Sequence, residues 1–278
     1  MVRMADETFE QNDSAGTDLY YSLIFADTSR RAGGFALHAL AAEIDAIPRS
    51  VSDPGIARIK LAWWHEELTR LDEGRPRHPL TRQLTTATSA AAPDFATLLA
   101  LPNAIETVLD WRSPPERGSL DAYLTQCHGS VWRQWAIISG DYDGATLDAA
   151  TRLGQLSGAF FALRGLHADL KAEIYKLSAE ALNEHEIDLE TLRGQATNSA
   201  LQPLFVHAVD QLRTSFEQTL SSLPKNMESG QLSQITLGRI MAHTLDEIAA
   251  SGSRLLTEQI SLTPLRKLFI AWRSRWGI

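Results

Sequence analysis

Nearly every long segment of this chain spaces its apolar residues with the period of an α-helix. Apolar residues recur three and four positions apart, as on one face of a helix, and the alternation typical of β-strands is scarce. In the segment 54–73, for example, Ile56, Ile59 and Trp63 follow this rhythm. Proline and glycine separate the periodic segments. The pattern therefore predicts an all-α protein.

Helices are expected between these breaker residues, at about 17–28, 31–47, 54–73, 78–91, 94–112, 118–140, 145–172, 199–222, 231–250 and 263–276. The polar stretch from about 176 to 196 is less periodic and predicts a short helix within a long connection. Neither an internal repeat nor a Pro-, Gly- or Ser-rich linker divides the chain. We therefore expect one helical domain over 17–278, preceded by a disordered tail over 1–16.

Composition narrows the functional classes. The chain has 278 residues, enough for a sizeable core, and a net charge of −8 without a Lys/Arg cluster, which argues against nucleic-acid binding. Cys127 is the only cysteine, so neither an intrachain disulfide nor a cysteine-based zinc site is expected. The amino terminus is acidic and polar, unlike a signal or transit peptide. These features predict a cytoplasmic protein and leave open peripheral contact with the inner membrane.

Two carboxylates at predicted helix ends suggest a metal site that has lost half of its ligands. An Asp-x-x-x-Asp pair stacks two carboxylates on one helix face, and two such helices can hold Mg²⁺ ions that bind a diphosphate. Here Asp45 is followed four positions later by Arg49, with Pro48 between them. Asp169 is preceded four positions earlier by Gly165, which offers no ligand. Each helix therefore keeps one carboxylate of the pair.

Five sequence blocks stand in an informative order. They are 35–40 leading to Asp45, 59–68 with 74–79, 120–123 with 128–130, 160–164 with Asp169 and Tyr175, and 264–268 with Trp272 and Trp276. Together they extend over roughly 20–277 and resemble the squalene/phytoene synthase family. No single block is specific, and the resemblance rests on the ordered set.

The resemblance implies an all-helical isoprenoid-synthase fold around a central cavity. Active members of that family are transferases of isoprenoid biosynthesis that join two prenyl diphosphates head to head with Mg²⁺. By this likeness Asp45 and Asp169 would be the catalytic residues and metal ligands of this chain. The residues that would contact the prenyl diphosphate substrate are Tyr20, Tyr21, Arg30, Arg31, Arg164 and Tyr175.

The missing carboxylates predict a degenerate active site. The run 43–53 resembles a non-catalytic branch of the family that contains a mitochondrial complex I assembly factor. By that likeness the protein would be an isoprenoid-lipid-binding or assembly-type protein, with a protein partner and without a cofactor. The alternative is an active, Mg²⁺-dependent head-to-head prenyl diphosphate synthase that uses a reduced ligand set.

Local ion pairs and packing compete with these functional roles. Asp45 either binds Mg²⁺, pairs with Arg49 or caps a local turn, and Asp169 either binds metal or pairs with Arg164 or Lys171. Arg164 in turn suits either a diphosphate oxygen or Asp169. The two tyrosines and two arginines near the first helices serve either substrate contact or ordinary packing and solvation. His38 and the tryptophans Trp63, Trp64, Trp111 and Trp135 are expected in the core.

Overall fold

The computed structural model describes residues 16–88, 94–140, 142–194, 201–225, 227, 231–251 and 260–276. Within these ranges the chain contains helices and connecting turns and no β-strand, so the predicted all-α class is confirmed. The predicted disordered tail falls almost wholly outside the described residues. None of the helices in the described ranges is long and apolar enough to cross a membrane.

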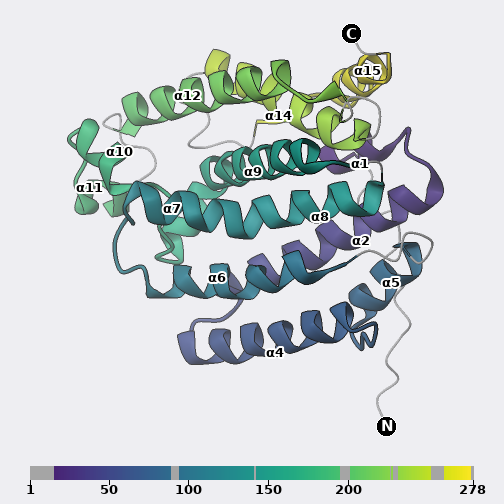
Figure 1. Ribbon diagram of the computed structural model, residues 1–278. Helices are drawn as coiled ribbons and strands as arrows, with labels where there is room; N and C mark the ends of the chain where they lie inside the picture. Colours follow the sequence, from purple (N-terminus) through teal and green to yellow (C-terminus); the bar gives the residue numbers. More distant parts are fainter. Residues whose placement is uncertain are drawn as a thin grey trace.

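The helices surround a long central helix, α9 (Gly144–Lys171), as Figure 1 shows. The helices α12 (Gln202–Ser221) and α14 (Leu232–Ser251) pack together on one side of it. On another side, α8 (Ser130–Ser139) packs against both α9 and α2 (Thr28–Asp45). The outermost helix on that side, α4 (Pro54–Asp72), contacts α6 (Ala100–Asp110).

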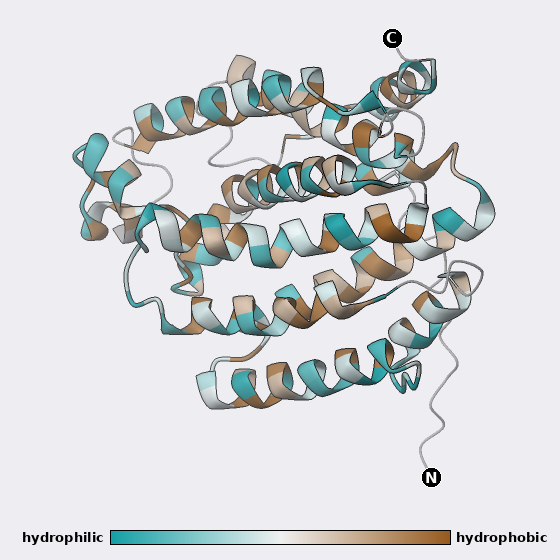
Figure 2. Ribbon diagram, viewed as in Figure 1, coloured by the Kyte–Doolittle hydropathy of each residue, from teal (hydrophilic) through white to brown (hydrophobic). Residues whose placement is uncertain are grey.

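Shorter elements complete the described structure. They are α1 (Asp18–Leu23), α3 (Ile47–Ser50), α5 (Pro79–Thr88), the 3₁₀ turn η1 (Ala96–Leu99), α7 (Arg117–Leu124), the π-helical turn η2 (Thr125–Gly129), α10 (Ala179–Glu184), α11 (Leu189–Gly194) and α15 (Pro264–Arg275). The ribbons of the long helices alternate between hydrophobic and hydrophilic segments, as expected for amphipathic helices around a shared core (Figure 2).

Several helix boundaries follow from capping residues. Asp53 accepts hydrogen bonds from the amides of Gly55 and Ile56, and Pro54 occupies the first position of α4, as expected. The predicted helix 17–28 instead ends at Leu23, because Asp27 caps a new helix by accepting from the Arg30 amide. The predicted helix 118–140 is interrupted by η2, and the connection 176–196 holds two short helices where one was expected.

The core positions of the tryptophans were predicted only in part. Trp64 and Trp135 are buried, and Trp111 is half-buried. Trp63 is exposed, contrary to expectation. Neighbouring residues on a helix point about 100° apart, so Trp63 and Trp64 cannot both face the same core. Trp63 instead packs edge-on against Trp64 and His78 at the surface.

Glycines allow η2 and α8 to approach α9 closely. A Cβ atom on Gly154 would lie 2.6 Å from the backbone oxygen of His128 and 2.9 Å from the Cα of Gly129. A Cβ atom on Gly158 would meet the ring of His128. This contact presses the π-helical turn, which carries Cys127 and His128, against the middle of α9.

Candidate functional site

Two carboxylates and two cations form a compact cluster where α2, α3 and the end of α9 meet. The guanidinium of Arg49 donates from Nη1 to Asp169 Oδ1 at 2.8 Å and from Nη2 to Asp45 Oδ2 at 2.8 Å. The Lys176 Nζ lies 3.6 Å from Asp45 Oδ1 and 3.7 Å from Asp169 Oδ2. We call Asp45, Arg49, Asp169 and Lys176 the ion-pair cluster.

The local backbone explains how Arg49 enters this position. The helix α2 ends at Asp45, and the short helix α3 carries Pro48 near its start. The Arg49 amide bonds to the Ala46 carbonyl at 3.1 Å, which turns the chain back toward the end of α2. Arg49 thus reaches its i−4 neighbour Asp45 and, across 120 residues of sequence, Asp169. The Asp45–Arg49 pair expected from the spacing is present.

Charge in the ion-pair cluster is balanced. The side chain of Asp169 is 2% exposed, that of Lys176 8%, that of Asp45 21% and that of Arg49 33%. Burial favours the neutral acid of Asp45, but the opposing charges of Lys176, His128 and Arg49 outweigh burial and lower its pKa to about 2. The ionised carboxylate of Asp45 therefore faces Arg49 and Lys176 in a partly buried site.

Aromatic and sulfur-containing side chains border the ion-pair cluster. The Tyr123 hydroxyl donates to Asp45 Oδ1 at 3.3 Å, and the Lys176 ammonium lies 5.7 Å from the Tyr123 ring centre. His128 and Cys127, on η2, each bring a donor atom close to Asp45. Burial outweighs the opposing effect of the Asp45 charge and, together with the charges of Lys176 and Arg49, lowers the pKa of His128 to about 4, so its imidazole is neutral at neutral pH.

This geometry fits a divalent cation poorly. Mg²⁺ requires uncompensated carboxylate oxygens, but both carboxylates are already neutralised by Arg49 and Lys176. Asp45, Cys127 and His128 place three donor atoms within 4.8 Å of one another, a set that would suit a transition metal. Burial raises the pKa of the Cys127 thiol, however, and the thiol form binds metals weakly. An internal ion-pair network is the arrangement these residues satisfy best.

Space remains open beside the ion-pair cluster. Phe161, Gly165 and Asp169 share one face of α9, because they are four residues apart. Phe161 is 47% exposed although it lies near His128, with ring centres 6.3 Å apart. A Cβ atom on Gly165 would meet only Asp169 Oδ2, at 3.8 Å. A Cβ atom is therefore accommodated at the position where a second carboxylate would stand.

The candidate substrate-contacting residues near the first helices serve local contacts. Arg30 pairs with Asp27, and Arg31 donates to the carbonyls of Ile24 and Ala26, which fastens the connection from α1 to α2. Tyr20 and Tyr21 pack edge to face, with ring centres 5.4 Å apart. These contacts account for all four residues without a ligand, and their role in substrate binding stays a prediction.

Two of the expected alternatives for ion pairing were wrong. Arg164 pairs with Asp18 at 3.5 Å, not with Asp169, and its guanidinium lies over the Phe160 ring. Asp18 also pairs with Lys267 at 2.8 Å. Asp169 pairs with Arg49 and Lys176 rather than with Arg164 or Lys171.

The structure also adds residues that the sequence did not single out. Tyr175 is buried, whereas the next residue, Lys176, turns its ammonium into the ion-pair cluster. Tyr123 and His128 lie in sequence blocks that carry the family resemblance but were not assigned a role at the site. The sequence Lys176-Leu177-Ser178 differs from the Tyr-Leu-Pro that the family resemblance implies at this point, and this difference was the available signal for Lys176.

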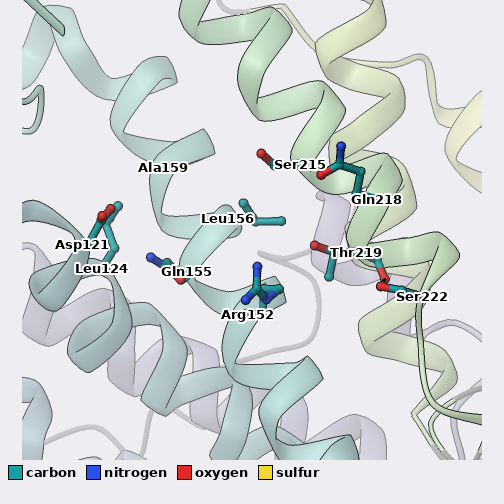
Figure 3. A pocket seen from close by; sticks show the side chains of 10 residues that line it. All are labelled: Asp121, Leu124, Arg152, Gln155, Leu156, Ala159, Ser215, Gln218, Thr219 and Ser222. Atoms are coloured by element: carbon teal, nitrogen blue, oxygen red, sulfur yellow. Dashed lines mark hydrogen bonds between the residues drawn. The ribbon is translucent and has the colours of Figure 1, made fainter. Parts of the chain in front are cut away.

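A separate groove lies between α7, α9 and α12, with a volume of about 440 Å³ (Figure 3). Its lining is mainly polar, and Arg152 projects from α9 toward the α12 residues Thr219 and Ser222. None of the residues of the ion-pair cluster lines this groove. It is therefore not an extension of the candidate site.

His38 makes the stability of the protein sensitive to acid. It packs edge-on against Trp135, and its buried Nε2 atom has no hydrogen-bond partner in the described structure, so the expected core histidine is only partly satisfied. Burial, followed by the charge of His128, lowers the pKa of His38 from 6.5 to about 4. Between about pH 4 and pH 6.5, His38 therefore binds a proton more readily in the unfolded chain than in the folded protein. The free energy of unfolding should fall by about 2 kcal/mol through His38 between pH 7 and pH 5.

Urea unfolding at pH 7 and pH 5 measures this effect. His38→Phe keeps an aromatic ring against Trp135 and should remove about 2 kcal/mol of the pH dependence. His65→Phe, on the exposed side of α4, is the matched control and should leave the pH dependence unchanged. An equal pH dependence in His38→Phe and the unaltered protein would contradict the assignment.

Comparison with known proteins identifies the family of this chain. The family model for squalene/phytoene synthase matches residues 13–266 of this chain. The chain belongs to the squalene/phytoene synthase family. No curated protein matches its sequence significantly.

Solved structures of other proteins share this fold. A dehydrosqualene synthase in complex with ligand superposes with a TM-score of 0.78 at 15% identity, covering 95% of this chain and 93% of that one. The squalene synthase HpnC from Alicyclobacillus acidocaldarius gives 0.67 at 16% identity, covering 86% and 88%. YisP from Bacillus subtilis subsp. subtilis strain 168 gives 0.64 at 12% identity, covering 92% and 90%. At these identities the likeness establishes the isoprenoid-synthase fold.

Proposed function

We propose that this protein is a non-catalytic member of the squalene/phytoene synthase family that binds an isoprenoid lipid. The observation that carries the proposal is Arg49, which bonds to both Asp45 and Asp169 at 2.8 Å. A guanidinium thus stands between the two carboxylates that would otherwise hold metal. The network is closed by Lys176.

Charge balance explains why this cluster should not support turnover. Departure of a diphosphate needs cations whose charge is free to neutralise the leaving group. Arg49 and Lys176 supply two positive charges, and Asp45 and Asp169 already compensate them. Mg²⁺ would repel Arg49 and Lys176 if they stayed in the partly buried site, and if they left it their ion pairs with Asp45 and Asp169 would be lost.

Binding of a prenyl chain places different demands on the site. An apolar chain needs accessible aromatic or aliphatic surface rather than metal, and Phe161 offers such surface beside the ion-pair cluster. The neutral imidazole of His128 and the hydroxyl of Tyr123 border the same region. The proposed ligand is therefore an isoprenoid lipid that binds without Mg²⁺.

The likeness of 43–53 to the complex I assembly branch extends the proposal to a protein partner. The segment contains both Asp45 and Arg49. Arg49, which takes the place of a metal-binding carboxylate, therefore belongs to the same segment that resembles the assembly branch. An assembly-type role would use the retained fold as a binding module. A cytoplasmic location, with contact at the inner membrane, belongs to this same proposal.

An active Mg²⁺-dependent prenyl diphosphate synthase is the second candidate. This candidate is favoured because Asp45 and Asp169 are both retained, and a single guanidinium, that of Arg49, bonds to both of them. In that case Arg49, the most exposed member of the ion-pair cluster, would swing aside when metal and diphosphate enter. Activity would then depend on both aspartates.

A turnover assay with pure protein separates the two candidates. Farnesyl or geranylgeranyl diphosphate with Mg²⁺ should be consumed no faster than in a protein-free control, whereas farnesol should raise the melting temperature without Mg²⁺. Mg²⁺-dependent product formation that is lost in both Asp45→Ala and Asp169→Ala would refute the non-catalytic proposal. Product formation that both variants retain would refute the active-synthase candidate as well.

A further inference from the structure

The carboxy-terminal helix α15 carries an apolar stripe that the described structure leaves uncovered. One face of α15 is buried against the protein, and it consists of Lys267, Ile270, Ala271 and Ser274. The opposite face is exposed and consists of Leu265, Leu268, Phe269, Trp272 and the adjoining Trp276. At 3.6 residues per turn the exposed members fall within an arc of about 100°. We call these five residues the α15 stripe.

Arginines border the α15 stripe on both sides. The helical period places Arg266 and Arg273 along one flank and Arg275 along the other. The Arg273 guanidinium lies 5.9 Å from the ring centre of Phe269, and that of Arg275 lies 5.4 Å from the ring centre of Phe25. Arg266 pairs with Glu247 of α14, whereas Arg273 and Arg275 form no ion pair with a carboxylate in the described ranges.

We propose that the α15 stripe docks the protein onto a bilayer that contains anionic lipids. Tryptophan and phenylalanine favour the boundary between headgroups and acyl chains, and leucines beside them add apolar area to be buried there. Arginines on both flanks can extend to lipid phosphates while the stripe enters the boundary. The exposed surface is the ridge of a helix, a convex shape that a fluid lipid surface accommodates.

Charge complementarity favours anionic lipid over a neutral surface. The whole chain carries a net charge of −8, so an anionic bilayer repels most of its surface. The guanidiniums of Arg273 and Arg275, for which the described part of the chain supplies no carboxylate partner, are the local exception and would orient α15 toward the phosphates. Binding should therefore require anionic lipid and weaken at high salt.

Another exposed apolar stripe, on α4, provides an internal control. It consists of Ile56, Ile59 and Trp63, and α4 lies on the opposite side of the molecule from α15 (Figure 1). Both helices cannot rest on one flat bilayer. The arginine beside the α4 stripe, Arg58, is already paired with Glu106 and Asp110.

Co-sedimentation with vesicles tests the proposal. The full-length protein should bind vesicles of equal parts phosphatidylglycerol and phosphatidylcholine, and should stay in solution with phosphatidylcholine alone. Phe269→Glu combined with Trp272→Glu changes only exposed side chains and should weaken binding at least about tenfold. Ile59→Glu on α4 should bind as the unaltered protein does. Circular dichroism confirms that each variant is folded.

Three results would overturn the proposal. The first is a protein that stays in solution with anionic vesicles at every lipid concentration. The second is equal loss of binding in Ile59→Glu and in the α15 variant. The third is a protein that does not bind vesicles and forms a dimer in analytical ultracentrifugation, where the α15 variant is a monomer. A second copy of the chain would then cover the stripe.

Arg273→Gln with Arg275→Gln should reduce the preference for anionic lipid specifically.

Discussion

Replacing Arg49 with methionine is expected to lower the free energy of unfolding by about 3 kcal/mol. The change removes two hydrogen-bonded ion pairs of 2.8 Å and leaves Asp45 and Asp169 facing each other with only Lys176 between them. The cost is large because the Asp169 side chain is 2% exposed, so water cannot replace the lost guanidinium. Urea unfolding at pH 7 measures the loss.

Two variants show whether burial of the charge causes this loss. Arg58→Met is the matched control, because Arg58 also contacts two carboxylates, Glu106 and Asp110, but at the exposed surface. It should cost less than about 1 kcal/mol. In the double variant Arg49→Met with Asp169→Asn, the uncompensated buried charge is gone, and most of the stability should return. A similar loss in Arg49→Met and Arg58→Met would disprove the assigned role of the ion-pair cluster.

Gly154→Ala is the second substitution with a large expected effect, a loss of about 3 kcal/mol. The new Cβ atom would meet the backbone oxygen of His128 at 2.6 Å, and backbone cannot rotate away as a side chain can. The helix α9 and the π-helical turn η2 would have to separate, which also loosens the packing around His128 and Cys127. Thermal unfolding followed by circular dichroism measures the effect.

Gly118→Ala is the control for this substitution. It places the same methyl group on the helix α7, where no atom lies within 4 Å. Alanine has the higher helix propensity, so this variant should be stabilised by a few tenths to about 1 kcal/mol. If Gly154→Ala is equally neutral or stabilising, close approach of the backbones does not explain the glycine.

The fold was largely predictable because helical periodicity and capping residues are local properties. The expected helices 54–73 and 145–172 agree closely with α4 and α9. The end of the first helix at Leu23 was missed because the capping by Asp27, which starts α2 at Thr28, competes with a plausible continuation of the first helix to residue 28. Trp63 was wrongly predicted to lie in the core. The prediction relied on the number of aromatic residues and did not consider the direction in which each one points from the helix.

The candidate site was predictable only where its contacts are local. The Asp45–Arg49 pair follows from a spacing of four residues. The bond from Arg49 to Asp169 spans 120 residues of sequence and depends on how α3 packs beside the end of α9. The entry of Lys176 depends on the path of the chain after α9, where helical periodicity gives no guidance.

In the proposed function Arg49 and Lys176 take the place of metal at this site, and a restored variant provides the positive control. Arg49→Asp combined with Gly165→Asp places one new carboxylate four residues after Asp45 and another four residues before Asp169, and a Cβ atom at Gly165 meets no atom closer than 3.8 Å. This variant should gain stability from Mg²⁺ with a non-hydrolysable farnesyl diphosphate analogue. A ligand present at a hundred times its Kd adds about 2.7 kcal/mol to the free energy of unfolding.

The most direct test is therefore the melting temperature of the unaltered protein with Mg²⁺ and that analogue, alone and together. The proposed replacement of metal predicts that Mg²⁺ produces no shift beyond that of the analogue alone, while the restored variant responds to the combination. A shift in the unaltered protein that requires both Mg²⁺ and the diphosphate would contradict the claim, because it would show that Arg49 yields its place to metal.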